Sequence, residues 1–189
     1  YVNTTAEIKA LSDVCCTSMN ALKIVESLPN EEVIFLPDRN MAAFIASKTD
    51  KKLIVWDGYC FVHNDIKVEY VQEMKERFPE SEVIAHPECK QDVLNISDEI
   101  CGTGGMAKYA KQSEATDFII ATECGMTDKL KEDISDKNFH SFCNICPYMK
   151  EITLQLALDS LKNNKHEINI LEETRLKAKK AIDRMLEIT

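Results

Sequence analysis

Two cysteines, Cys60 and Cys146, each stand on a stretch of sequence that follows a short apolar run. A cysteine presented on a loop after a strand is able to act as a thiolate ligand of a soft metal centre. His86 and Glu88 follow another apolar run, and an imidazole close to a carboxyl group suits proton transfer. We therefore expect Cys60 and Cys146 to ligate one metal centre together, and we favour a [4Fe-4S] cluster.

A zinc site is an alternative interpretation of the same region. Zinc binds tetrahedral sets of thiolates and imidazoles, and three cysteines with one histidine form a common set. The residues with this spacing are Cys60, His63, Cys143 and Cys146. A zinc-stabilised binding module is therefore a second hypothesis, and a redox protein built on the Cys143–Cys146 pair is a third. The other cysteines are expected to pack as small apolar residues: Cys15, Cys16, Cys89, Cys101 and Cys124.

The sequence repeats itself with a constant shift of 85, which carries Cys16 onto Cys101. Further pairs at this shift are Ser12 with Ser97, Asp13 with Asp98, Tyr1-Val2-Asn3 with His86-Pro87-Glu88, Ser18 with Thr103, and Pro37-Asp38 with Thr122-Glu123. A shift of 86 then joins Cys60 to Cys146, whereas His63 and Cys143 have no matching ligand. Repetition of this kind indicates two copies of one folding unit, and it favours the cluster over the zinc site.

Short β-rich runs alternate with amphipathic helical stretches. The expected strands are Val33–Leu36, Leu53–Trp56, Val83–Ala85, Phe118–Ala121 and Phe139–Phe142. The expected helices are Met19–Leu28, Met41–Lys48, Val68–Phe78, Gly105–Gln112, Met126–Ile134, Met149–Lys162 and Leu171–Ile188. Such alternation predicts an α/β fold of repeated three-layer αβα units, in which parallel sheets are covered by helices on both faces. Ligands of such sheets bind beyond the carboxyl ends of the strands.

The repeat also sets the expected boundaries of the units. Residues 1–62 form one α/β unit whose own start is expected to lie ahead of Tyr1, and residues 63–148 form the next unit. Residues 149–189 form a C-terminal helical segment that closes the fold.

Polar groups at equivalent places form a candidate site for an anionic ligand. The spacing from Tyr1 to Ser18 equals the spacing from His86 to Thr103. Both hydroxyl residues stand at expected helix starts, where they serve either as N-caps or as ligand contacts. The glycines around Thr103 favour the second role, because they let a ligand approach backbone N–H groups closely. A carboxylate or a phosphate fits this arrangement.

The composition excludes several classes of function. The net charge of −9 argues against nucleic acid or an anionic membrane as a partner, because both require clustered Lys and Arg. No run of about 18 apolar residues is present to cross a bilayer. No secretory signal is visible, so the eight cysteines are expected to be reduced thiols in a cytoplasmic protein.

The residues described above resemble the motif series of the quinolinate synthase family. The similarity runs in unbroken order from Tyr1 to the final helix. The motifs that carry it are Tyr1-Val2-Asn3-Thr4, Cys16-Thr17-Ser18, Leu36-Pro37-Asp38, Gly58-x-Cys60, His86-Pro87-Glu88-Cys89, Gly102-Thr103-Gly104, Thr122-Glu123 and Cys146-x-x-Met149-Lys150.

The resemblance implies a fold and an activity. The family condenses iminoaspartate with dihydroxyacetone phosphate to give quinolinate, on the route to NAD. Its fold has three similar α/β domains around a pseudo-three-fold axis, so this chain would hold two of the three. One cysteine from each domain binds a [4Fe-4S] cluster, whose fourth iron keeps an open position and acts as a Lewis acid.

The resemblance also assigns roles to individual residues. Cys60 and Cys146 match two of the cluster ligands, and His86 and Glu88 are the candidates for proton transfer. Gly102 stands where the family often has serine. The residues that match contacts to the dicarboxylate substrate are Tyr1, Val2, Asn3, Ser18, His86, Pro87, Glu88 and Thr103.

Nothing in the sequence matches the first domain of this family. We therefore expect the third cysteine ligand to lie outside these 189 residues, and the isolated chain neither to hold the cluster normally nor to catalyse the reaction. The family's substrate suggests functional coupling to L-aspartate oxidase or aspartate dehydrogenase.

Overall fold

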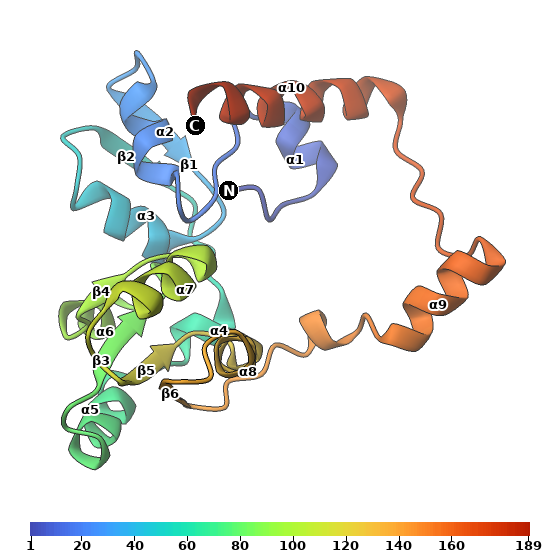
Figure 1. Ribbon diagram of the computed structural model, residues 1–189. Coiled ribbons are helices and arrows are strands. Elements are labelled where there is room, and N and C mark those ends of the chain that lie inside the picture. The colour runs from blue at the N-terminus through green and yellow to red at the C-terminus, as the bar shows by residue number, and fades with distance from the viewer.

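Two parallel β-sheets form the framework of the computed structural model, which describes residues 1–189 (Figure 1). The first sheet pairs β1 with β2, and the second has the strand order β4-β3-β5-β6. All neighbouring strands run parallel, which confirms the predicted α/β fold. The strands are β1 (Glu32–Phe35), β2 (Lys52–Val55), β3 (Glu82–Ala85), β4 (Glu99–Ile100), β5 (Asp117–Ala121) and β6 (Asn138–Ser141).

Helices connect these strands, and most of them overlap predicted ranges, whereas the short helices Ala6–Leu11, Phe61–Asn64 and Gln91–Asn95 were not predicted. They are α1 (Ala6–Leu11), α2 (Ala21–Ser27), α3 (Arg39–Ala46), α4 (Phe61–Asn64), α5 (Val68–Arg77), α6 (Gln91–Asn95), α7 (Thr103–Gln112), α8 (Cys124–Asp133), α9 (Leu154–Asn163) and α10 (Glu172–Ile188). The single helix predicted over Met149–Lys162 is wrong, because a 3-10 turn at Tyr148–Lys150 precedes α9. Thr153 separates the two, since its side chain accepts the Leu156 N–H and caps α9.

The second sheet is buried between two layers of helices. One of its faces carries Ile119 and Ala121 of β5, which pack with residues of α5 and α6. The other face carries Phe118 and Ile120, which pack with residues of α7 and α8. All four of these β5 side chains are fully buried, so this unit is the three-layer αβα arrangement that the alternating elements predicted.

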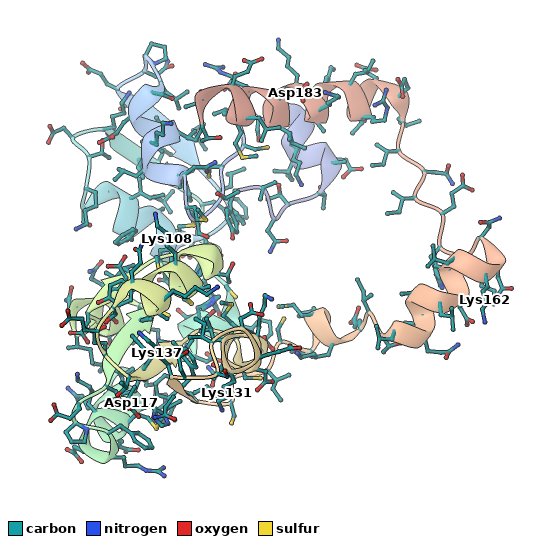
Figure 2. The ribbon with its side chains drawn as sticks, in the orientation of Figure 1. Lys108, Asp117, Lys131, Lys137, Lys162 and Asp183 are labelled. Carbon is teal, nitrogen blue, oxygen red and sulfur yellow. The ribbon has the colours of Figure 1, made fainter.

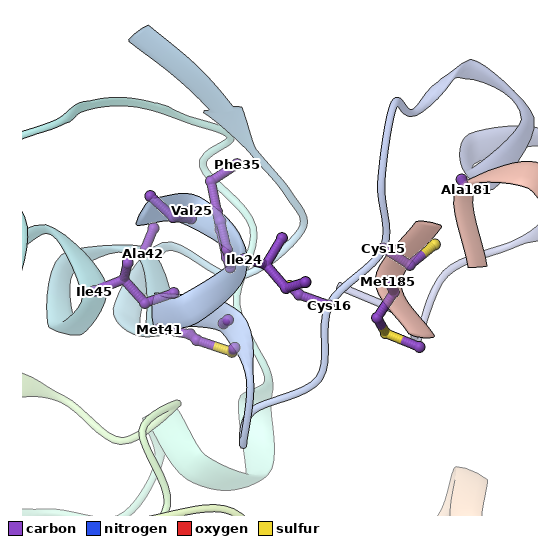
Figure 3. Close-up of a cluster of buried hydrophobic side chains, with 11 residues drawn as sticks. Cys15, Cys16, Ile24, Val25, Phe35, Met41, Ala42, Ile45, Ala181 and Met185 are labelled. Atoms are coloured by element: carbon purple, nitrogen blue, oxygen red, sulfur yellow. The ribbon is translucent and has the colours of Figure 1, made fainter. Parts of the chain in front are cut away.

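The first sheet packs on a separate core. Phe35 of β1 lies among apolar side chains of α2 and α3, including Ile24 and Met41 (Figure 3). Ala181 and Met185 of α10 complete this cluster, so the C-terminal helix packs on the core of the first sheet. Figure 1 shows α10 beside α1 at the end of the molecule that carries both termini.

The segment between the two units and α10 extends away from both sheets. Figure 1 shows α9 standing apart, and no residue of this helix is buried. Leu154 and Leu161 are almost fully exposed, and Figure 2 shows Lys162 on the same outlying helix. None of the helices has both the length and the apolar character needed to span a bilayer.

The sequence repeat is visible in the hydrogen bonds of the backbone. The Tyr1 amino group donates to the carbonyl of Leu36, and the His86 N–H donates to the carbonyl of Ala121. His86 is the repeat equivalent of Tyr1, and Ala121 is the repeat equivalent of Leu36. The segments after β1 and β5 are therefore equivalent in structure as well as in sequence.

Candidate metal and substrate site

A cleft of about 1140 Å³ lies at the carboxyl ends of the strands of both sheets. Segments that follow β1, β2, β3, β5 and β6 all contribute to its wall, as expected for a parallel sheet. The predicted site residues that line it are Tyr1, Asn3, Cys60, His86, Glu88, Thr103 and Cys146. Val2, Ser18 and Pro87 are not part of the wall.

Ser18 lies behind the wall, against Gly102. A Cβ atom added to Gly102 would lie 2.3 Å from Ser18 Oγ, so glycine at this position leaves room for the hydroxyl group. Burial raises the pKa of the Tyr1 hydroxyl, and the nearby Ser18 side chain partly offsets this rise. Ser18 therefore supports a residue that lines the cleft.

The N-cap role considered for the two hydroxyl residues is wrong. Asn20 occupies the N-cap position of α2, and Gly102 occupies that of α7. Thr103 is the first residue of α7 and faces the cleft. Its hydroxyl group is therefore available to a ligand at the helix N-terminus.

Glu88 and two histidines form a buried polar network in the cleft wall. Oε2 of Glu88 lies 3.0 Å from His63 Nδ1 and 3.3 Å from His86 Nδ1. The two imidazole rings stack with their centroids 4.4 Å apart. Nε2 of His63 lies 2.8 Å from the hydroxyl oxygen of Thr122. Each of the three ionisable side chains is thus held in place by the others.

The pKa values of this network favour a carboxylate next to one charged imidazole. Burial raises the pKa of Glu88, but the close contacts of its carboxylate with His63 and His86 outweigh it and hold the pKa well below its usual range. Burial lowers the pKa of His63, but the neighbouring Cys60 and Glu88 outweigh it and raise the pKa. The pKa of His86 is lowered, chiefly by burial. The network therefore offers a neutral and a charged imidazole on one carboxylate.

Three side chains of this region are close enough to share one metal ion. The Sγ of Cys60, a ring nitrogen of His63 and a carboxylate oxygen of Glu88 lie within 4.8 Å of one another. His63 Nδ1 is buried and makes no well-aligned hydrogen bond, although Glu88 is near. Sequence reasoning did not group Glu88 with Cys60, because the two residues lie far apart along the chain and follow different strands.

The loops of Cys60 and Cys146 meet at the cleft. Both thiols are half-buried and both residues line the cleft wall. The Asn144 side-chain amide donates to the carbonyl of Val62 at 3.0 Å, which ties the two loops together directly. The structure therefore brings the two predicted metal ligands to one cavity.

The four zinc candidates are not assembled. Cys143 is exposed and does not line the cleft, and its backbone is in the left-handed region with φ 55°. Cys60 and His63 instead share their neighbourhood with Glu88. A tetrahedral site of three cysteines and one histidine would require the Cys143 segment to move.

The donor set fits a thiolate-bound cluster. All eight cysteines are free thiols, and Cys60 and Cys146 are the two that line the cleft. Thiolates are the usual ligands of iron–sulfur clusters, and the cavity is far larger than a single metal ion requires. Two thiolates provide part of the ligand set of such a cluster.

Comparison with known proteins identifies similar sequences along the whole chain. The model of the family described as NadA, quinolinate synthetase A protein, matches residues 1–187. The chain is 47% identical to quinolinate synthase 1 of Methanosarcina acetivorans, and 45% identical to the quinolinate synthase of Geotalea uraniireducens. Both alignments cover 100% of this chain and 62% of the relative. The chain thus spans less than two thirds of the length of these relatives.

Proposed function

The chain belongs to the quinolinate synthetase A protein family, and from this premise we propose that it forms part of a quinolinate synthase. The reaction would condense iminoaspartate with dihydroxyacetone phosphate to give quinolinate, for the synthesis of NAD. The observation that carries the proposal is the convergence of two thiols and a buried Glu–His network on one cleft.

Cys60 and Cys146 are the proposed thiolate ligands of a [4Fe-4S] cluster. Their free thiols, their position on one cleft and the hydrogen bond between their loops support this role. An iron of the bound cluster with an open coordination position would supply Lewis acidity toward a substrate oxygen. His63 and Glu88 lie within 4.8 Å of Cys60 and would orient groups around that position.

The dicarboxylate substrate would bind between the two repeated polar segments. Tyr1, Asn3 and Thr103 line the cleft and offer two hydroxyl groups and an amide. Thr103 begins α7, whose first backbone N–H groups are free to face a carboxylate. Ser18 would act on the substrate through Tyr1, and Val2 and Pro87 would hold the backbone between neighbouring contact residues.

His86 and Glu88 are the proposed groups for proton transfer. Glu88 is held as a carboxylate of lowered pKa, so it is a weak base by itself and would take part in proton transfer together with the His86 imidazole, 3.3 Å away. The lowered pKa of His86 leaves its imidazole neutral, so it is able to accept or donate a proton at the same place. His63 would keep Glu88 ionised through its raised pKa.

The proposed enzyme includes residues beyond this chain. The relatives are longer than this chain, which supports the idea that a further unit supplies the third thiolate and further substrate contacts. We propose that residues 1–62 and 63–148 are two units of a three-unit enzyme, followed by the C-terminal segment 149–189. On this view the isolated chain is inactive.

Chemistry also suggests the supply of the substrate. Iminoaspartate is an imine that water hydrolyses, so an enzyme that makes it from aspartate, an L-aspartate oxidase or an aspartate dehydrogenase, would act close by. The free state of all eight cysteines suits a reducing compartment such as the cytoplasm.

A coupled assay tests the proposed activity. Full-length protein, purified without oxygen, is supplied with dihydroxyacetone phosphate and with iminoaspartate generated in the cuvette, and quinolinate is measured. We expect quinolinate from the wild type, and at least about 100-fold less from Glu88→Gln, since general acid–base groups contribute factors of this size. A colourless protein that contains stoichiometric zinc and makes no quinolinate would support the zinc-stabilised binding module instead.

A further inference from the structure

Asp38 connects a helix to the loop that carries Cys60. It is the N-cap residue of α3 and only 2% exposed. Its Oδ1 accepts the N–H of Met41 at 2.7 Å, as in an ordinary N-cap. Its Oδ2 accepts the N–H of Cys60, also at 2.7 Å. The second oxygen therefore serves the cysteine loop rather than the helix.

Glu123 makes the same pair of contacts in the second unit. It is the N-cap residue of α8 and 6% exposed. Its Oε2 accepts the N–H of Gly125 at 2.7 Å, and its Oε1 accepts the N–H of Cys146 at 3.4 Å. A Cβ atom on Gly125 would lie 2.7 Å from Oε2, so glycine at this position lets the longer side chain fold back onto its own helix.

A backbone hydrogen bond accompanies each of these contacts. The N–H of Arg39, the first residue of α3, donates to the carbonyl of Gly58 at 2.8 Å. The N–H of Cys124, the first residue of α8, donates to the carbonyl of Asn144 at 3.0 Å. Each carbonyl belongs to the second residue before the cysteine. Each cysteine loop is thus joined to a helix N-terminus by two hydrogen bonds.

The hydrogen bonds that hold the two cysteine loops occur at equivalent positions of the sequence repeat. The shift of 85 carries Asp38 onto Glu123 and Arg39 onto Cys124, while the cysteine loops are shifted by 86. A helix cap alone explains one carboxylate oxygen in each case, but not why the other oxygen binds the cysteine N–H both times. The same pair of partners, a helix N–H and a cysteine N–H, recurs in both units although the carboxylates differ in length, which points to a shared requirement at the cysteine.

We propose that Asp38 and Glu123 are positioning residues that hold the cysteine loops, so that the Cys60 and Cys146 thiolates keep the spacing a cluster needs. This inference rests on the proposed function. A carboxylate that accepts N–H groups orders a loop without touching the metal, which is how outer groups orient metal ligands in general. Lys150 lies 3.5 Å from Glu123 Oε1 and steadies the second carboxylate.

The test separates this role from helix capping. Asp38→Ser keeps a side chain that is favoured as an N-cap, but it is too short to reach both Met41 and Cys60. Glu123→Gln keeps the shape and removes one acceptor oxygen. Thr153→Ala and Thr5→Ala are the controls, because they remove the N-caps of α9 and α1, and neither side chain hydrogen-bonds to the loop of Cys60 or Cys146.

The readouts concern the cluster and not only the activity. Full-length proteins are reconstituted without oxygen. The first readout is the time that a ferrous chelator needs to remove half of the iron. The second is the electron paramagnetic resonance spectrum of the reduced cluster. We expect Asp38→Ser and Glu123→Gln to lose iron about 10-fold faster than the wild type or more, with altered spectra. Both control variants should match the wild type in iron release and in spectrum.

The outcomes are distinguishable. A wild type that holds the cluster, with Asp38→Ser and Glu123→Gln indistinguishable from it, overturns the positioning role and leaves the proposed function standing. A wild type that takes up no iron and sulfide overturns both. If Asp38→Ser does not fold, Glu123→Gln decides the matter by the same two readouts.

Discussion

The two units of this protein hold their cysteine loops in the same way on unequal sheets. The second sheet has four strands, and its β5 side chains are buried on both faces. The first sheet has two strands, and Ile34 of β1 is 71% exposed. The repeat places the equivalent of β4 at Val14–Cys15.

Val14–Cys15 shows how the first unit differs locally. In the second unit Ile100 of β4 pairs with Ala85 of β3. The equivalent Cys15 N–H instead donates to the carbonyl of Ala181 in α10 at 3.0 Å. The loop contacts of Asp38 nevertheless match those of Glu123. The difference teaches that the geometry of the site depends on helix N-termini and on the strands next to them, and not on the width of the sheet.

The largest effect is expected from the buried sheet. Phe118→Ala removes a fully buried ring that stacks on Phe139, and we expect it to lower the free energy of unfolding by about 4 kcal/mol. The matched change Ile34→Ala in β1 should cost less than about 0.5 kcal/mol, because Ile34 is largely exposed. Chemical denaturation of both variants measures the two losses in the free energy of unfolding. Equal losses would contradict the difference in burial between the two sheets.

The next effect concerns the buried network around Glu88. Glu88→Gln leaves His63 and His86 without their buried anion, and we expect a loss of about 3 kcal/mol in the free energy of unfolding. Asp117→Asn is the control, since its 3.3 Å contact with His140 lies nearer the surface and should be worth less than about 1 kcal/mol. A Glu88→Gln protein as stable as the control variant would show that the buried network does not stabilise the fold.

A smaller effect is expected where the cysteine loops touch. Asn144→Ala removes the side-chain bond to the Val62 carbonyl, and the loss should be about 1 kcal/mol, the usual net contribution of one hydrogen bond. Asn40→Ala is the matched control, because it removes another single hydrogen bond from an asparagine side chain to a backbone carbonyl, that of Glu88. Asn164 is not used, because its backbone is in the left-handed region with φ 48°. Thermal unfolding curves of both variants should shift by similar amounts, and a null result for Asn144→Ala would contradict direct contact between the loops.

The smallest effect belongs to α9. Thr153→Ala removes the cap of a helix that has no buried residue, so we expect faster hydrogen exchange confined to α9 and a change in global unfolding below about 0.5 kcal/mol. Faster exchange in the β5 amides of the same variant would show that α9 supports the core.

The sequence predicted every strand with a clear apolar run and missed β4, which has two residues and begins with Glu99. It also missed α1, α4 and α6, which have six, four and five residues, too few to show a helical period. The convergence of Tyr1, Cys60, His86 and Cys146 followed from the repeat and the rule for parallel strands. Hydrophobic periodicity detects helices and strands that are long enough to show a repeating pattern, so the short elements between them are not detected.

The supporting residues of the site were harder to foresee. The repeat matched Asp38 with Glu123, but their partners are backbone N–H groups of distant loops, Cys60 and Cys146. His63 of α4, after β2 of the first sheet, likewise contacts Thr122, which follows β5 of the second sheet. Backbone donors carry no sequence signal, and pairing over such distances becomes visible only when the strands are placed in space.

The most direct test of the metal centre uses three single variants of the full-length protein: Cys60→Ser, Cys146→Ser and Cys143→Ser. Each is purified without oxygen and assayed for iron, sulfide and zinc per chain. The cluster assignment predicts that Cys60→Ser and Cys146→Ser lose iron and sulfide, whereas Cys143→Ser, whose exposed thiol lies outside the cleft, keeps both. Stoichiometric zinc in the wild type that Cys143→Ser abolishes would contradict it.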